Sequence, residues 1–241
     1  MNISTKLLKA AAGAAAGGAG LDVDEVFSTY LYDGTGSAQT ITNGIDLAGE
    51  GGLVWTKTRS SNQYGHRLID EGSNVILSSD VTNGALNGSL SVTQYYLAGQ
   101  SNGFNLVGSE FNVSGQDYAS WTWRKAPRFF TCLTYTGNGS NRSISHNLGG
   151  TVGMLIIKRT DGSGDWYVLD VGTGKRGYLN GTYAFSTANG LFFGDGSTYQ
   201  APTSTEFYLS SNGNINQNGS TYVAYLFAHN DGDGEFGPDS D

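Results

Sequence analysis

Residues able to do chemistry are scattered along this chain and form no recognisable catalytic motif. The three histidines, His66, His146 and His229, lie far apart and outside the patterns of serine hydrolases and zinc peptidases. The single cysteine, Cys132, lies in an apolar, strand-like run, which is typical of a small buried hydrophobic residue. A pair of catalytic carboxylates, as in glycoside hydrolases, is a spatial arrangement that sequence does not reveal. We predict a protein that is not an enzyme and has no disulfide framework.

The C-terminal end of the sequence holds a candidate cation site. Asp231, Asp233 and Glu235 occupy alternate positions with glycines between them, and carboxylates are the hard oxygen ligands that Ca²⁺ prefers. The run lacks the spacing of an EF-hand loop and its distal bidentate glutamate. The alternative is a solvated acidic turn or linker, and no other cofactor is expected.

Two aromatic residues are candidates for carbohydrate binding, which needs exposed rings beside amides or carboxylates. Trp166 follows Asp165, and Tyr199 lies in the long loop 189–204. Long loops on β-sandwiches often carry recognition residues. The alternative is that both rings pack at the edge of a sandwich.

Composition favours short strands joined by tight turns. Charged residues make up only 14% of the chain, which contains 37 glycines and 14 tyrosines. The net charge of −8 argues against nucleic acid as a partner, because no basic stripe is present to neutralise phosphates. No stretch has the length of apolar sequence that a membrane-spanning helix needs, so no membrane association is expected.

The first 24 residues differ from the rest. Ser4 and Thr5 are good helix caps, and the segment 6–16 is rich in helix-forming alanine. Such a helix buries too little surface to be stable alone, so it either docks on a neighbouring chain or stays a flexible tail. It is a poor secretion signal, because Lys9 and several glycines interrupt the apolar run. In the docking interpretation the anchoring residues are Lys6, Leu7, Leu8 and Lys9.

From Phe27 onward the sequence alternates between apolar and polar residues with the period of β-strands. Turn dipeptides such as Asn43-Gly44 and Asn102-Gly103 separate the runs, and no helical pattern lies between them. This pattern predicts an all-β protein with antiparallel β-sandwiches of the jelly-roll or concanavalin-like type.

The pattern then repeats. Short motifs of the first half recur in the same order 100 to 104 residues later, for example Tyr32–Gly36 at Tyr135–Gly139 and Leu53–Lys57 at Met154–Lys158. Such regularity predicts an internal duplication that produced two tandem sandwich units. We expect an anchor at 1–24, units at 25–127 and 128–230, and an acidic Gly-rich segment at 231–241.

The short junction between the units predicts that they pack against each other. In the last strand of each unit, large rings alternate with smaller side chains: Trp121 and Trp123 in the first, Tyr225 and Phe227 in the second. We expect this aromatic face to form the centre of each sandwich core.

Five segments of the two units form a recognisable pattern: Phe27–Gly36, Asn43–Trp55, Trp121–Pro127, Ile144–Gly149 and Tyr222–Gly237. With these segments both units resemble a module of structural proteins in marine tailed phages, found in tail fibres and related virion appendages. The resemblance implies tandem concanavalin-like sandwiches and a location in the virion, and it brings no catalytic residues.

The function predicted from this resemblance is that of a non-catalytic virion structural protein. We expect a tail fibre or appendage that is anchored by its N-terminus, takes part in attachment to the host surface, and forms a homo-oligomer such as a trimer. Its partners are then other tail or capsid proteins and, at the host surface, a glycan. The alternatives are a capsid decoration or head-fibre protein and a lectin-like glycan-binding module.

Overall fold

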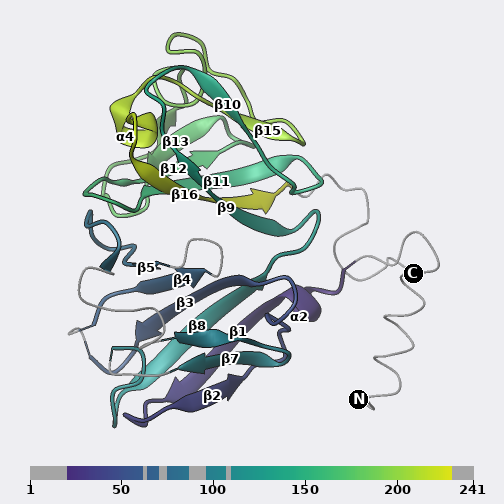
Figure 1. The fold of residues 1–241 in the computed structure, drawn as a ribbon, viewed down its shortest axis with the longest axis vertical. Helices are drawn as coiled ribbons and strands as arrows, with labels where there is room; N and C mark the ends of the chain where they lie inside the picture. The colour runs from purple at the N-terminus through teal and green to yellow at the C-terminus, as the bar shows by residue number, and fades with distance from the viewer. Residues whose placement is uncertain (1–20, 62–63, 71–74, 87–95, 107–109, 230–241) are drawn as a thin grey trace, which may run out of the picture.

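Antiparallel strands dominate the computed structural model, which describes residues 21–61, 64–70, 75–86, 96–106 and 110–229. Figure 1 shows two bodies joined by one crossing of the chain. The N-terminal helix expected at 6–16 lies outside the described residues, and a one-turn helix α2 (Val23–Val26) precedes the first strand. Fold class is therefore confirmed as all-β.

The first body contains two antiparallel sheets. Its larger sheet has the strand order β1-β8-β3-β4-β5, and its smaller sheet has the order β2-β7-β6. The strands are β1 (Phe27–Asp33), β2 (Gln39–Thr42), β3 (Gly52–Thr58), β4 (Arg67–Asp70), β5 (Ile76–Leu77), β6 (Tyr96–Gln100), β7 (Gly103–Leu106) and β8 (Asp117–Arg124).

The second body has a similar arrangement, with one more edge strand in its larger sheet and one strand fewer in its smaller sheet. Its larger sheet has the order β9-β16-β11-β12-β13-β14, and its smaller sheet pairs β10 with β15. The elements are β9 (Phe130–Thr136), β10 (Arg142–Ser145), β11 (Val152–Arg159), β12 (Trp166–Asp170), β13 (Lys175–Tyr178), β14 (Ser186–Thr187), β15 (Glu206–Leu209), the helix α4 (Gly213–Asn216) and β16 (Thr221–Ala228).

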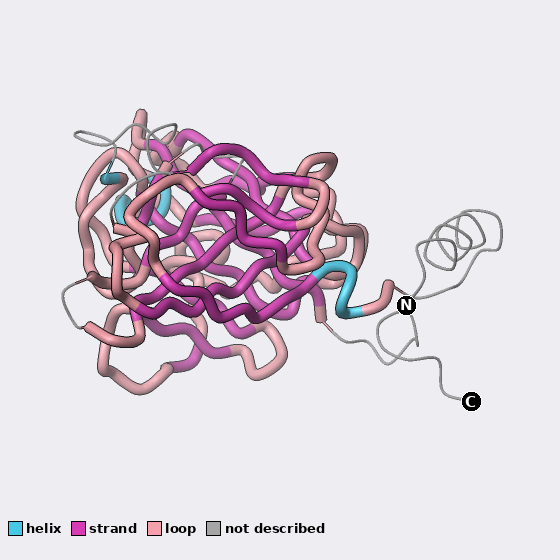
Figure 2. The backbone as a smooth tube through the Cα atoms, turned by 90° about the horizontal axis from the view of Figure 1, so that it is seen from below, coloured by secondary structure: helices cyan, strands magenta, loops and turns pink. Residues whose placement is uncertain are grey.

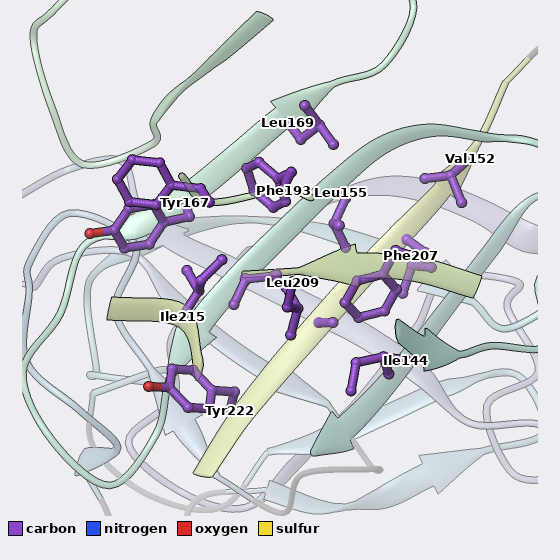
Figure 3. Packing of buried hydrophobic residues seen from close by; sticks show 14 of the residues in the cluster. Ile144, Val152, Leu155, Tyr167, Leu169, Phe193, Phe207, Leu209, Ile215 and Tyr222 are labelled. Atoms are coloured by element: carbon purple, nitrogen blue, oxygen red, sulfur yellow. The ribbon is translucent and has the colours of Figure 1, made fainter. Parts of the chain in front are cut away.

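Three apolar clusters hold these sheets together. One fills the space between the two sheets of the first body, with Phe104 and Tyr118 facing each other from opposite sheets. A second does the same in the second body, where Phe207 and Leu209 of β15 lie over Leu155 of β11 (Figure 3). The third joins the two larger sheets, so the described residues form a stack of four sheets, with the two bodies one above the other in Figure 1. Figure 2 shows from below that strands make up most of the described chain.

The same tyrosine pair closes one end of each body. Tyr32 stacks on Tyr118 with ring centroids 5.0 Å apart, and Tyr135 stacks on Tyr222 at the same separation. The Tyr32 hydroxyl donates to the Phe111 carbonyl at 2.8 Å, as Tyr135 does to the corresponding carbonyl of Ile215 at 2.6 Å. In each pair, one hydroxyl thereby supplies a hydrogen-bond donor to a backbone carbonyl beside the apolar core.

A buried asparagine forms an equivalent hydrogen bond in each body. Asn112 and Asn216 are both fully buried. The Asn112 side-chain oxygen accepts from the Thr35 backbone N–H at 2.7 Å, and that of Asn216 accepts from the Asn138 N–H at 3.0 Å. Each asparagine thus ties the loop before the last strand to the turn after the first strand.

The aromatic face of the last strands does not form the sandwich cores. Within each body the core-facing ring of the last strand is Tyr118 or Tyr222, whereas Tyr225 and Phe227 point to the opposite side. Trp123 meets Phe227 across the gap between bodies, with ring centroids 6.0 Å apart. The expectation was wrong because these strands are covered on both faces, so alternation alone did not identify the inner one.

Candidate functional site

Several residues predicted to form sites lie outside the described part of the chain. These are the anchoring residues Lys6, Leu7, Leu8 and Lys9 and the acidic residues Asp231, Asp233 and Glu235. Among the described residues, no group of three or more His, Cys, Asp or Glu side chains is placed to hold a metal ion. None of the helices in this same part of the chain is long and apolar enough to cross a membrane.

The two candidate sugar-binding aromatics are separated. Trp166 is fully buried between the bodies, and its indole N–H donates to the Ser78 carbonyl at 2.8 Å. It therefore offers no face on which a sugar ring could stack, and its selection as a glycan-binding residue was wrong. Tyr199 is half-buried and packs against the core of the second body, with its hydroxyl enclosed.

The histidines are also separated and serve local roles. His66 accepts a hydrogen bond at Nδ1 from the Trp55 indole N–H at 2.9 Å, and burial lowers its pKa. His146 accepts from the Leu148 backbone N–H at Nδ1, and burial lowers its pKa as well. Cys132 is a buried free thiol, as predicted, and its Sγ lies 3.9 Å from Asp70 Oδ1.

The most distinctive polar chemistry lies where the two bodies meet. Asp70, at the end of β4, is 1% exposed and accepts a hydrogen bond from the Tyr225 hydroxyl at 2.9 Å. Burial is the main reason why the pKa of Tyr225 is well above its usual value. A carboxylate held in this way between two sheets fixes their relative position, because burying it without a donor is costly.

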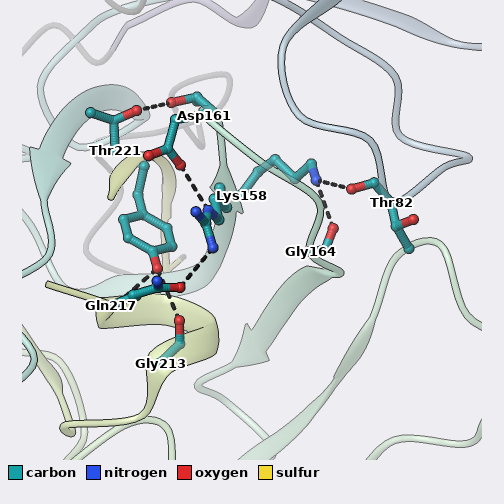
Figure 4. Close-up of polar contacts among 10 residues, drawn as sticks. Thr82, Lys158, Asp161, Gly164, Gly213, Gln217 and Thr221 are labelled. Carbon is teal, nitrogen blue, oxygen red and sulfur yellow. Dashed lines mark hydrogen bonds and ion pairs between the residues drawn. The ribbon is translucent and has the colours of Figure 1, made fainter. Parts of the chain in front are cut away.

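A buried lysine forms a second connection. Lys158 on β11 donates from Nζ to the Thr82 carbonyl at 2.9 Å and to the Gly164 carbonyl at 2.6 Å (Figure 4). Burial lowers its pKa to about 8. Two backbone bonds, Gly164 N–H to Thr82 and Ala85 N–H to Thr160, reinforce this junction. The loop after β5 is therefore fastened to the loop after β11.

Toward the other end of β11 and β12, where Met154 pairs with Asp170, the two large sheets separate and leave an open cleft of about 640 Å³. One wall is the outer face of the first body, where Trp55 on β3 and Trp123 on β8 have ring centroids 6.3 Å apart. The opposite wall comes from the second body and includes Phe227 on β16 and Phe185 just before β14. The volume is in the range typical of small-molecule sites, which often lie between domains.

Gly177 on β13 leaves space for Phe185, which is part of the cleft wall formed by the second body. A Cβ atom at this position would lie 2.2 Å from Cδ1 of Phe185, so the missing side chain leaves room for that ring over β13. Phe185 remains 41% exposed, and Leu179 beside it remains 38% exposed. The cleft therefore opens to solvent along an apolar rim.

A single carboxylate, Asp170, lines this otherwise apolar cleft. It lies at the end of β12, and its pKa is lowered chiefly by a hydrogen bond from the Thr173 hydroxyl, with backbone N–H groups adding to the effect. Among the described lining residues there is no Lys, Arg or His. The cleft is thus aromatic and carries one ionised acid.

Sequence reasoning did not find this cleft, although two of its rings had been noticed. Trp123 and Phe227 were assigned to sandwich cores, and Asp170 was not selected as a site residue. The available clue was that β16 is apolar on both faces, because a strand of that kind lies in the middle of a layered structure. The separation of the sheets that opens the cleft depends on packing and has no sequence signature.

The fold is that of an all-β, antiparallel, β-sandwich-like protein with an apolar cleft between its two bodies. Comparison with family models identifies residues 22–238 as a match to DUF7483, a domain of unknown function, and the chain belongs to this family. Comparisons with curated proteins and with solved structures give no match.

Proposed function

We propose that this protein is a non-catalytic structural protein of a phage virion, in a tail fibre or similar appendage that contacts the host surface. The observation that carries the proposal is the fastening of two sandwich-like bodies into one four-sheet stack through Asp70, Lys158 and a shared apolar layer. Such an arrangement favours a fixed shape over relative motion of the bodies. The resemblance to phage appendage modules supplies the location.

We also propose that the two bodies arose by internal duplication and are concanavalin-like. Support comes from the matching strand orders, the matching tyrosine pairs and the matching buried asparagines. Gly34 and Gly137 give further support, because each lies against the loop that precedes the last strand of its own body. A Cβ on Gly34 would lie 2.0 Å from the Val113 carbonyl oxygen, and a Cβ on Gly137 would lie 2.2 Å from that of Gln217. Unrelated sandwiches have no reason to share these details.

In this proposal the segment 1–24 attaches the protein to other virion proteins, and the sandwiches project outward as a homo-oligomer. Many weak contacts with a host surface then add up through copy number. Trp166 does not support a glycan receptor, because its side chain is fully buried.

The test is immunogold electron microscopy on particles from a lysate of a culture that expresses the protein, with antigen-blocked antibody as the control. Label at the tail is the expected result. Label spread over the head would replace the tail assignment with a capsid decoration role. Absence of label on intact and on detergent-opened particles would contradict the virion proposal altogether.

A further inference from the structure

The cleft between the two bodies combines two features that together specify a kind of ligand. Five aromatic side chains line it: Trp55, Trp123, Tyr178, Phe185 and Phe227. The remaining apolar lining consists of aliphatic side chains, and the only ionisable acid is Asp170. The faces of aromatic rings carry partial negative charge, so the rings and the carboxylate both attract a cation, provided that the cation is weakly hydrated and loses its water easily.

We propose that this cleft binds an organic cation with apolar substituents, such as a quaternary or alkylated ammonium group. Charge complementarity selects this class: an anion meets Asp170 unfavourably, and a sugar finds few polar partners among the lining residues. A purely apolar molecule gains nothing from the carboxylate. This proposal goes beyond the virion function and does not depend on it.

The lining residues are already arranged for such a ligand. The Trp55 indole N–H is donated to His66, so Trp55 presents carbon surface and not a donor to the cleft. The Trp123 ring lies 6.0 Å from that of Phe227 with planes at 79°, so rings from both bodies meet in an edge-to-face arrangement at the cleft. Because these two rings already touch each other, a bound cation lies beside the pair and can contact rings of both walls from there.

Asp170 is held ionised and in place by its own turn. Its Oδ1 and Oδ2 accept from the Thr173 backbone N–H and hydroxyl, respectively. Lys175 lies opposite Asp170 across the β12–β13 ladder, but its side chain is exposed and does not line the cleft. His229 is also nearby, since its Nε2 and Asp170 Oδ1 each lie 3.6 Å from a Cβ built on Gly172, but it does not line the cleft. A ligand ammonium group can therefore approach Asp170 from inside the cleft, where no cationic side chain lines the wall.

The experiment compares choline with 3,3-dimethyl-1-butanol, its neutral isostere, in titrations followed by tryptophan fluorescence and calorimetry on the full chain. We expect the cation to bind at least about tenfold more tightly than the isostere, and benzyltrimethylammonium to bind more tightly than choline because it fills more of the cleft. Equal binding of choline and isostere, or no saturable binding of either cation, would overturn the proposal.

Variants locate the site. Asp170→Asn keeps the shape and an acceptor for Thr173 but removes the charge, and we expect about a tenfold loss in cation affinity with no change for the isostere. The matched control is Asp195→Asn, because Asp195 also accepts from backbone N–H groups of its own turn but lies outside the cleft lining. Equal effects of the two substitutions would refute the assignment. If Asp170→Asn does not fold, the comparison of choline with its isostere on the unaltered protein still decides.

Discussion

Removing one hydroxyl tests whether the polar contacts between the bodies stabilise the whole stack. In Tyr225→Phe, Asp70 stays buried and loses the donor that lies 2.9 Å away, while the ring packing is kept. Hydrogen bonds to charged groups contribute about 1.5–3 kcal/mol, so we expect a loss of about 2 kcal/mol in the free energy of unfolding. For a chain of this size that corresponds to a fall in Tm of roughly 4–8 °C.

Tyr208→Phe is the matched control. Its hydroxyl donates to Glu206 Oε1 at 2.7 Å, which is also a phenol–carboxylate bond, but both side chains are only partly buried on β15 and remain accessible to water. Urea denaturation followed by tryptophan fluorescence gives both free energies of unfolding. We expect no measurable change for this variant, because water replaces the lost bond. If Tyr225→Phe is as stable as Tyr208→Phe, burial between the bodies does not give the Asp70 contact its importance, and the reasoning fails.

The remaining predictions concern the buried lysine, a close backbone contact and the repeated tyrosines. Burial lowers the pKa of Lys158 in the folded protein to about 8, so between about pH 8 and 10.5 the folded protein binds fewer protons than the unfolded chain. The cost of burying the charged amine should therefore disappear as the pH rises through this range. Urea midpoints measured at about pH 8 and at about pH 10.5 should show the unaltered protein gaining stability relative to Lys158→Met. Gly34→Ala places Cβ 2.0 Å from the Val113 carbonyl oxygen and should cost more than about 2 kcal/mol, whereas Gly213→Ala meets nothing within 4 Å and should be nearly neutral in the same assay. Tyr32→Phe and Tyr135→Phe each remove one hydroxyl–carbonyl bond and should each cost about 1 kcal/mol; strongly unequal losses would argue against equivalent roles in the two bodies.

The strand pattern was readable from the sequence because it depends on local alternation and turn residues. Runs 27–32 and 118–123 appear as β1 and β8, and in β8 the burial of successive residues alternates between the two faces of the sheet. The burial of Cys132 followed from its apolar neighbours in the same way. These features are set within a few residues of the chain.

The candidate site was not readable, because it depends on contacts between residues far apart in sequence. Asp70 and Tyr225 are neighbours only after two complete bodies have folded and packed. Trp166 looked like an exposed binding residue because it follows a charged residue, yet Ser78 from the other body satisfies its N–H. A polar or aromatic residue at such an interface has the same local sequence as one at the surface.

Trp123 connects the beginning and the end of the described fold. Its ring lies 5.2 Å from Phe27 at the start of β1 and 6.0 Å from Phe227 near the end of β16. The polypeptide therefore enters and leaves the four-sheet stack at nearly the same place. Chains with adjacent ends tolerate circular permutation and can be inserted into a host protein. A force that pulls on the two ends of the described fold would then act mainly on this small aromatic contact and not on the two apolar cores. The four-sheet stack would therefore lie to one side of the line of force and would not transmit the force itself.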